Sequence, residues 1–516
     1  MDYLSNPEYK NRVVQMIPYK SIVKLYKDKK KPLYLQLANQ LMQLIKEGTL
    51  ISDAPLPSSR KLAELLNLHR KTVIAAYEEL QLQGWITTIP KKGTFVNSKV
   101  PIIVQKDFKV KNAINKKTIA GFTFYKNKEL IPHTNNQKKE LIYINDGVPD
   151  TRLAPLKELA IIYRNIVSKK NTIQYINYGT THGNNDLRRV LAIYLNQTRG
   201  LKITEENILI TRGSQMGIYL SSQLIIKQKD IIVTGETNYI SADRTFLHQG
   251  AEIKRIKVDT NGLCINDLEK LCATTKIKAI YITSHHHHPT TVTLSAERRI
   301  AILQLAKKYN FAILEDDYDY DFHYSHSPIL PLASHDTNGN VIYLGSICKS
   351  VAPVFRVGYM IATKDVINEA ATRRKYIDRQ GDALLEMTFS KFIANGDLQR
   401  HTNKVLKIYK ERRDLFCKLI KEELSEFLEF EIPKGGMAIW VVLHKKYKWK
   451  QIAEISEKHN LRITDWKNYD PTNSGHNGMR FGFASYTLKE IEILVLRLKK
   501  TLEEVKKENN GHLKHC

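Results

Sequence analysis

The segment VIYLGSICKSVAPVFRVGY, residues 341–359, decides how the rest of this chain is interpreted. Its apolar first half predicts a buried strand, and the loop that follows presents Lys349. Ser346 precedes this lysine by three residues, and Arg356 follows it by seven. A single lysine is usually a surface residue, but the apolar surroundings and this spacing argue against that here. Because a guanidinium binds phosphate through two parallel hydrogen bonds, the segment indicates an amine beside a phosphate site.

Other segments place polar groups where strands are predicted to end. FAILEDDYDYDF, residues 311–322, reads as a buried strand that ends in carboxylates, and open α/β sheets bind ligands at such ends. ILITRGSQMGIYLSSQLI, residues 208–225, reads as a strand, a tight turn and a helix whose first amides can hold a phosphate. IIVTGETNYISA, residues 231–242, offers Tyr239 as an aromatic ring.

Together these groups meet the needs of pyridoxal phosphate (PLP), which requires a Schiff-base lysine, an acid at the pyridine nitrogen and a hydroxyl at the phenolic oxygen. We assign Lys349 to the first role, Asp316 to the second with Asp317 as its rival, and Tyr318 to the third. Tyr239 would stack on the ring. The phosphate group would be held by Gly213, Ser214, Gln215, Ser346 and Arg356.

The chain around these segments alternates between apolar strand-like runs and amphipathic helices from about residue 141. That alternation predicts an α/β fold with a largely parallel sheet covered on both faces. Residues 366–510 return to long helices with a few strands and predict a smaller α+β part. We therefore expect one domain over 141–510, with its large part over 141–365.

The N-terminal residues 1–97 predict a winged helix-turn-helix. Helical periodicity appears over 33–47, then from Ser58 or Ser59 onward, and again from about His69 to Leu82. WITTIPKKGTFV, from residue 85, reads as a strand hairpin with a basic tip. In such motifs the second helix of the pair enters the major groove. The candidate DNA contacts are Ser58, Ser59, Arg60, His69, Arg70, Lys71, Thr72, Lys91 and Lys92.

Charge and composition agree with a polyanionic partner. The net charge is +27, and residues 1–140, with 25 Lys/Arg and 11 Asp/Glu, carry about half of that excess. Residues 98–140 are rich in Lys and Asn without a sustained period and predict a linker. The chain lacks a long apolar run, a signal-peptide core and paired or metal-spaced cysteines, so we expect a cytoplasmic protein with reduced thiols.

Two family resemblances follow from these motifs. Residues 31–97, with LPSSR and AYEELQLQGW, resemble the GntR-family winged helix-turn-helix, although His69 stands where Ser is frequent. Residues 141–505 resemble fold-type-I aminotransferases through G-S-Q, E-D-D-Y, and S-x2-K followed by P-x2-R-V-G. That resemblance implies that Arg480, in MRFGFAS, binds a substrate carboxylate. It also implies that Tyr178, in YGTTHGNNDLRR, reaches the phosphate of the other subunit's cofactor.

The whole chain resembles the MocR subfamily of GntR regulators, whose members often form head-to-tail dimers. At 286–291 it has HHHPTT where ordinary aminotransferases have N-P-x-G, and the subfamily pattern implies that His286 contacts the cofactor. Cys348 stands where Ser is usual. The four histidines at 285–288 suggest a metal tract, but a strand would splay them to opposite sides, so we expect no metal.

The resulting prediction is a homodimeric transcriptional regulator that binds operator DNA and senses PLP or a PLP–amino compound adduct. One alternative is a metabolic aminotransferase with an accessory DNA-binding domain. Another is a nucleic-acid binder that has lost its cofactor, which Lys349, Asp316 and Arg356 argue against. The sequence does not name the effector, the operator or the sign of regulation, and it leaves open whether amino transfer turns over.

Overall fold

The computed structural model describes residues 17–26, 31–98, 120–124, 141–324, 329–347, 349–463, 465–470 and 475–512. Contacts divide the chain into two units, residues 1–134 and residues 135–516. Most of the predicted linker lies outside the described residues, as do Cys348 and Cys516. Each unit is described by itself.

The first unit has the predicted winged helix-turn-helix fold. Leu37, Leu41 and Ile45 recur on one face of α3 (Leu33–Lys46) and are buried against the other helices. The remaining elements are α2 (Tyr19–Ile22), β1 (Pro55–Leu56), α4 (Ser59–Leu66), α5 (Arg70–Leu82), β2 (Ile86–Ile89) and β3 (Gly93–Val96), and the strands form one antiparallel sheet in the order β1-β3-β2.

A side chain caps the N-terminus of each of the two helices of the helix-turn-helix. The Ser58 hydroxyl accepts the backbone N–H of Lys61 at 3.3 Å, which begins α4. α4 ends at Asn67, whose left-handed backbone (φ 50°) turns the chain toward α5. His69 then caps α5, since its Nδ1 accepts the Lys71 N–H at 3.2 Å. A histidine thus fills the position where the GntR-family pattern frequently has serine.

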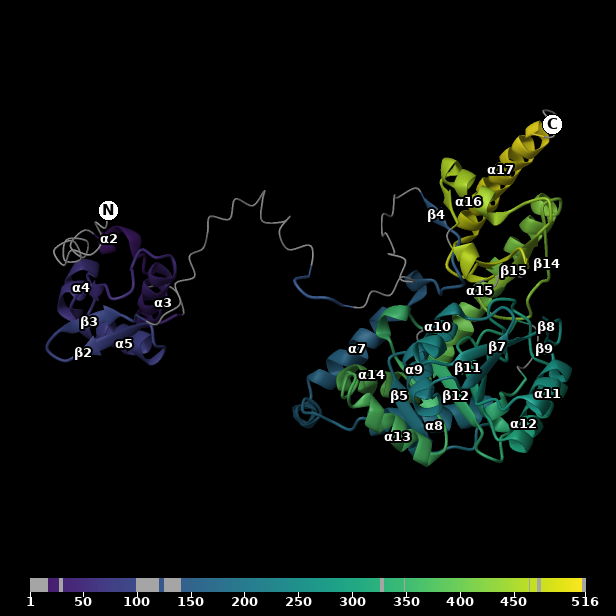
Figure 1. The fold of residues 1–516 in the computed structure, drawn as a ribbon, viewed down its shortest axis with the longest axis horizontal. Helices are drawn as coiled ribbons and strands as arrows, with labels where there is room; N and C mark the ends of the chain where they lie inside the picture. The colour runs from purple at the N-terminus through teal and green to yellow at the C-terminus, as the bar shows by residue number, and fades with distance from the viewer. Residues whose placement is uncertain are drawn as a thin grey trace. The chain divides into compact units, whose positions relative to one another are not determined.

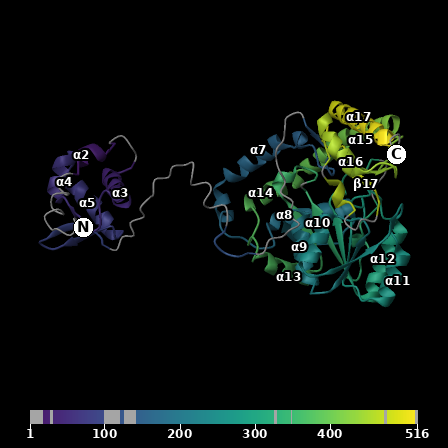
Figure 2. The same ribbon diagram turned by 45° about the horizontal axis from the view of Figure 1, so that its top comes forward.

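The second unit is built on a seven-stranded sheet (Figures 1 and 2). Every neighbouring pair is parallel except those made by β13, which runs antiparallel to both of its neighbours. The strand order is β5 (Ile208–Thr211), β13 (Gly358–Ile361), β12 (Val341–Ser346), β11 (Ala312–Asp317), β10 (Ala279–Ile282), β6 (Ile231–Gly235) and β7 (Glu252–Ile256).

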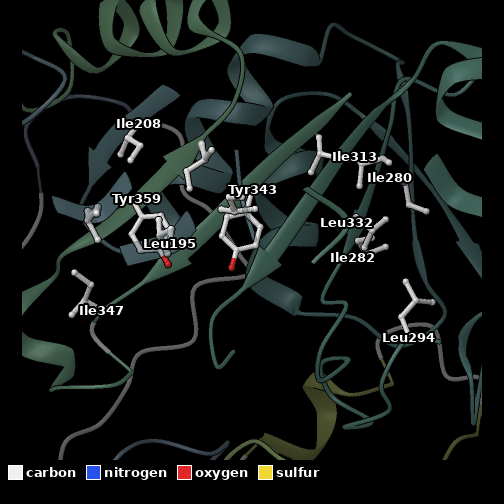
Figure 3. Packing of buried hydrophobic residues seen from close by; sticks show 14 of the residues in the cluster. Leu195, Ile208, Ile280, Ile282, Leu294, Ile313, Leu332, Tyr343, Ile347 and Tyr359 are labelled. Carbon is white, nitrogen blue, oxygen red and sulfur yellow. The ribbon is translucent and has the colours of Figure 1, made fainter. Parts of the chain in front are cut away.

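Both faces of this sheet are buried, as the nearly continuous apolar runs predict. On one face, Ile280, Ile313 and Tyr343 point the same way from neighbouring strands (Figure 3) and pack against α8 (Asn185–Arg199), α11 (Ile265–Thr274), α12 (Ala296–Tyr309) and α14 (Ala383–Ala394). The other face packs against α9 (Ser214–Ile225), α10 (Ile240–His248) and α13 (Lys364–Arg374). α7 (Leu156–Val167) lies against α14.

A smaller α+β part forms the C-terminal end of the unit, with its own core. α15 (Asp397–Leu424) connects the large part of the unit with this smaller part. Its Leu398 packs in the core around the seven-stranded sheet, whereas its buried apolar residues from Val405 to Leu424 pack in the core of the smaller part. An antiparallel sheet β14-β15-β17 (Leu428–Phe430, Ala438–Leu443, Gly478–Gly482) packs with α16 (Trp449–Ser456) and α17 (Leu488–His512). β4 (Ile142–Tyr143) pairs with β16 (Leu461–Arg462), so the start of the unit joins this C-terminal part.

Candidate cofactor site and nucleic-acid interface

Lys349 lies in the loop after β12, at the carboxyl ends of the parallel strands. Its Nζ donates a hydrogen bond to the Gly147 carbonyl at 3.0 Å and lies 5.7 Å from the centre of the Tyr318 ring. Burial lowers the pKa of the Lys349 amine, although the Asp146 carboxylate opposes that effect. A lowered pKa increases the fraction of free amine, which is the form that attacks a carbonyl carbon.

Asp316, the last residue but one of β11, has an oxygen without a partner. Its Oδ2 accepts the Tyr281 hydroxyl at 2.8 Å, whereas its buried Oδ1 has no hydrogen-bond partner among the described residues. Burial raises the pKa of this carboxyl to about 7. A buried acceptor left open in this way fits a ligand N–H such as a protonated pyridine nitrogen.

Asp317 points to the opposite side of β11, as strand alternation requires. It accepts the Tyr343 hydroxyl at 2.7 Å and lies 3.1 Å from Nδ1 of His285. Although burial raises its pKa, His285, Arg199 and Tyr343 more than offset this and hold the pKa of Asp317 below its usual range. The geometry therefore favours Asp316 over Asp317 as the ligand-facing acid.

The residues predicted to hold a phosphate lie at and near the N-terminus of α9. Gly213 precedes the helix with φ 75°, and a Cβ there would lie 2.8 Å from an Arg356 guanidinium nitrogen, so only glycine allows this approach. Arg356 also donates to the Arg212 carbonyl at 2.9 Å. Ser346, at the end of β12, pairs in register with Gly358, which itself packs on Gly213. Ser214 and Gln215 form the first turn of α9.

Arg480, on β17 of the C-terminal part, lies in the same site as Tyr318. Its guanidinium is 1% exposed and donates to the Tyr318 hydroxyl at 3.1 Å, the Pro289 carbonyl at 3.1 Å and the Asp146 carbonyl at 3.0 Å. The structure therefore gathers Lys349, Tyr318 and Arg480, as the sequence motifs suggested.

The histidine run divides between two environments. The His286 ring lies 2.9 Å from Asp319 and 5.2 Å from the His323 ring, and its backbone carbonyl, not its ring, accepts the Tyr318 hydroxyl. The His288 ring instead lies 5.2 Å from Tyr239 and 6.4 Å from Tyr318. Among the described residues, no group of three or more His, Cys, Asp or Glu side chains is arranged to hold a metal ion.

Sequence reasoning missed four groups at this site, which are Asp146, His288, Tyr281 and Tyr469. Tyr281 sits one strand away from Asp316, and Asp146 and Tyr469 come from segments distant in sequence. For His288, the only sequence signal was the alternation of a strand, which would place His286 and His288 on the same side. β10 ends at Ile282, however, so the histidine run does not lie in that strand and the alternation does not apply.

Tyr178 lies on the surface of the isolated chain, 76% exposed, with the Arg379 guanidinium 3.8 Å from the centre of its ring. The neighbouring Gly179 N–H donates to Gln380 at 2.5 Å, which places these two segments side by side. Ile173, Ile176 and Tyr376 are also largely exposed. This surface is unusually apolar for one that faces water.

The candidate DNA contacts gather on the first unit. Arg70, at the start of α5, donates to the Ser59 hydroxyl at 3.4 Å. Lys91 turns the β2–β3 hairpin with a left-handed backbone (φ 63°). Ser59 and Thr72 are half-buried, and the other candidates are exposed. None of Arg60, Arg70, Lys71, Lys91 and Lys92 forms an ion pair with another described residue, so their charge is available to phosphates.

No helix in the described part of the chain is long and apolar enough to cross a membrane.

The fold and site define the second unit as an aminotransferase-type module and the first as a DNA-binding module. Residues 162–498 match the family model "Aminotransferase class I and II", and residues 33–96 match "Bacterial regulatory proteins, gntR family". The chain belongs to the aminotransferase class I and II family and carries a GntR-type domain in front of it. It is therefore a DNA-binding transcriptional regulator of the MocR type.

Three comparisons illustrate this architecture. The Bacillus subtilis "Uncharacterized HTH-type transcriptional regulator YdeL" is 25% identical, over 91% of this chain and 96% of its own. The Rhizobium meliloti "Probable rhizopine catabolism regulatory protein MocR" is 23% identical, over 80% of this chain and 82% of its own. A Pyrococcus horikoshii kynurenine aminotransferase structure, in complex with PMP, is 27% identical with a TM-score of 0.66, covering 71% of this chain and 91% of that one.

The raised pKa of Asp316 predicts a pH-dependent stability in the absence of cofactor. Its pKa is about 7 in the folded chain but near 4 when unfolded, so between these values the folded state binds more protons. Stability therefore rises as pH falls through 7. Relative to Asp316→Asn, which does not titrate, the wild type should lose up to about 4 kcal/mol between pH 4 and pH 8. Calorimetric unfolding of both proteins across this range measures the difference, and parallel pH profiles would contradict the prediction.

Proposed function

We propose that this regulator binds PLP through Lys349 and uses it to sense PLP itself or a PLP–amino compound adduct. The observation that carries the proposal is the buried Oδ1 of Asp316, which has no hydrogen-bond partner among the described residues, in the same site as a partly buried lysine whose pKa is lowered. A buried carboxyl group with a strongly raised pKa is typical of a functional site. A regulator that binds operator DNA acts in the bacterial cytoplasm.

The residues fit each part of the cofactor. Asp316 would accept the pyridine N–H, and Tyr318 would donate to the phenolic oxygen. Tyr239 would cover the ring. The phosphate would lie against the first amides of α9 and the Arg356 guanidinium, because a helix N-terminus and a guanidinium both favour anions. The role predicted for His286 stays a prediction, and the His288 ring lies nearer to Tyr239 and Tyr318.

Bound PLP supplies an electrophilic carbon that captures amines and a ring that accepts electrons. The protein's own groups do the rest. Lys349 offers its amine and can accept a proton when that amine is displaced, and Arg480 orients the ligand from β17. Since Lys349 and Arg480 belong to the two parts of the second unit, a ligand that contacts both changes the energy of their arrangement. Such differential binding is what a conformational switch requires.

Aminotransfer is a second candidate function, favoured by the presence of Lys349, Asp316, Tyr318 and Arg480 in one site. The two functions differ in turnover, since a sensor must hold its ligand long enough for DNA binding to respond. Efficient keto-acid production with no effect of any ligand on operator binding would make the protein an enzyme with an accessory DNA-binding domain.

We also propose a homodimer, built head to tail, that reads paired operator half-sites. Support comes from the exposed surface of Ile173, Ile176, Tyr178 and Tyr376. In such a dimer Tyr178 would serve the partner's phosphate.

Lys349→Ala should abolish covalent PLP attachment, because no other amine would occupy its position. Full-length protein is incubated with PLP, treated with borohydride and examined by absorbance and peptide mass spectrometry. The control is Lys364→Ala, an exposed lysine on α13 paired with Glu206 at 3.0 Å, which should label like the wild type. A variant lacking Lys349 that still gives a borohydride-fixed adduct at the site would refute the assignment.

Operator binding should depend on Arg70 and Lys71 and fall steeply with salt, because neutralised phosphates release counterions. We expect the double alanine variant to lose at least about tenfold in affinity, since one base contact contributes about 1–3 kcal/mol. Binding isotherms on an operator selected from a random DNA pool, at several salt concentrations, measure both effects. Lys307→Ala with Lys308→Ala, on α12, removes the same charge elsewhere and should leave affinity nearly unchanged.

Ile176→Asp should convert a dimer to monomers, because a carboxylate buried in an apolar contact weakens association by about a hundredfold or more. Ile176 is 70% exposed, so the change costs an isolated chain little. Ile300→Asp, 53% exposed on α12, is the matched control and should remain dimeric. Sedimentation at micromolar concentration with PLP present tests this, and a monomeric wild type would exclude the dimer.

A further inference from the structure

Asp146 lies beside the guanidinium that the carboxylate of an α-amino acid would need. Its Oδ1 is 3.6 Å from Nε of Arg480 and accepts the Tyr469 hydroxyl at 2.7 Å, and its Oδ2 is 2.8 Å from Nε2 of His288. Although burial raises its pKa, His288, Arg480 and Tyr469 together hold the pKa of Asp146 below its usual range. The carboxylate therefore stays charged at neutral pH and is fixed from three directions.

Arg480 is correspondingly engaged by the protein itself. Each of its three guanidinium nitrogens donates a hydrogen bond, to Tyr318, to Pro289 and to the Asp146 backbone, and the Asp146 carboxylate balances its charge. A ligand carboxylate arriving here would meet a neutralised cation and a like charge within a few ångströms. The Asp146 side chain is 36% exposed and the Arg480 side chain is 1% exposed, so water screens the repulsion between the two carboxylates only in part.

The charged groups around the Lys349 amine also disfavour a ligand carboxylate. Three carboxylates, of Asp146, Asp316 and Asp319, and one guanidinium, of Arg480, act on this amine. The ring nitrogen of a bound cofactor would neutralise Asp316, and His286 lies 2.9 Å from Asp319. Asp146 is likewise paired with His288, but it adjoins Gly147, whose carbonyl accepts a hydrogen bond from Nζ of Lys349, so this carboxylate lies beside the amine that a ligand replaces.

We propose that Asp146 is a specificity-determining residue that makes this site select primary amines without a carboxylate on the amine-bearing carbon. The inference rests on the proposed function, because it assumes that ligand amines replace the Lys349 amine on PLP. In that exchange the ligand nitrogen takes the bond that Lys349 gives up, and the two protons that the ligand ammonium loses go to Lys349. No oxidant or further reactant is needed.

The test compares two ligands that have a single amine and differ only in the α-carboxylate, L-norleucine and pentan-1-amine. Each is titrated into the PLP-loaded, full-length protein, and half-saturation is read from the absorbance change. The wild type should half-saturate with pentan-1-amine at a concentration roughly tenfold or more below that of L-norleucine. Asp146→Asn keeps the size of the side chain but removes its charge, and it should narrow this gap by roughly tenfold, mainly by tighter binding of L-norleucine.

Asp186→Asn is the control, because Asp186 is a surface carboxylate on α8 paired with Arg189 at 3.0 Å, and it should behave like the wild type. A wild type that binds L-norleucine as tightly as pentan-1-amine, or an Asp146→Asn variant with unchanged discrimination, overturns the inference alone. A wild type without any Lys349-dependent chromophore overturns the proposed function and the inference with it.

Discussion

Three consecutive buried carboxylates at the end of β11 impose the constraint that organises the second unit. Glu315, Asp316 and Asp317 are each at most 3% exposed, and an unpaired buried charge is far too costly to leave in place. Glu315 is satisfied by the Ser284 hydroxyl and the Leu332 and Ala333 amides, and Asp317 by Tyr343 and His285. Among the described residues, Oδ1 of Asp316 and Oδ1 of Asp317 both lack a hydrogen-bond partner, but the His285 ring lies 3.1 Å from that of Asp317. The strand's alternation thus separates two structural acids from one that is left for a ligand.

The ligand-facing side depends in turn on the segment 142–150, where the two parts of the unit meet. β4 pairs with β16 of the C-terminal part, Asp150 pairs with Arg412 on α15 at 2.9 Å, and Gly147 accepts from Lys349. A change in the Lys349 amine therefore acts on a segment that is fixed to the C-terminal part. Arg480 makes the reciprocal connection, since β17 carries it to Tyr318 at the end of β11.

Much of this was predictable from the sequence because it follows from local patterns. The helix and strand periods of residues 33–96, the apolar runs of the parallel sheet and the fold class are confirmed. The meeting of Lys349, Tyr318 and Arg480 was inferred from motif order. What the sequence could not supply were the contacts that tertiary packing decides. Asp316 and Asp317 are chemically alike, and their partners come from other segments: Tyr281 for Asp316, and Tyr343 and His285 for Asp317. Likewise, the end of β10 at Ile282 separates His286 from His288, and no local pattern marks that end.

The packing around Asp316 also bears on why such a site suits a sensor. Burial raises the pKa of Asp316 to about 7, so keeping this carboxyl charged above that pH costs stability, and a ligand N–H that pairs with Asp316 offsets the cost. The same holds for Lys349, a partly buried residue whose amine has a lowered pKa and donates a hydrogen bond to the Gly147 carbonyl. A ligand that pairs with these groups therefore gains part of its binding free energy by removing a local destabilisation, and it does so in the segments that join the two parts of the unit. A ligand with no preference between the arrangements of those parts would shift no equilibrium.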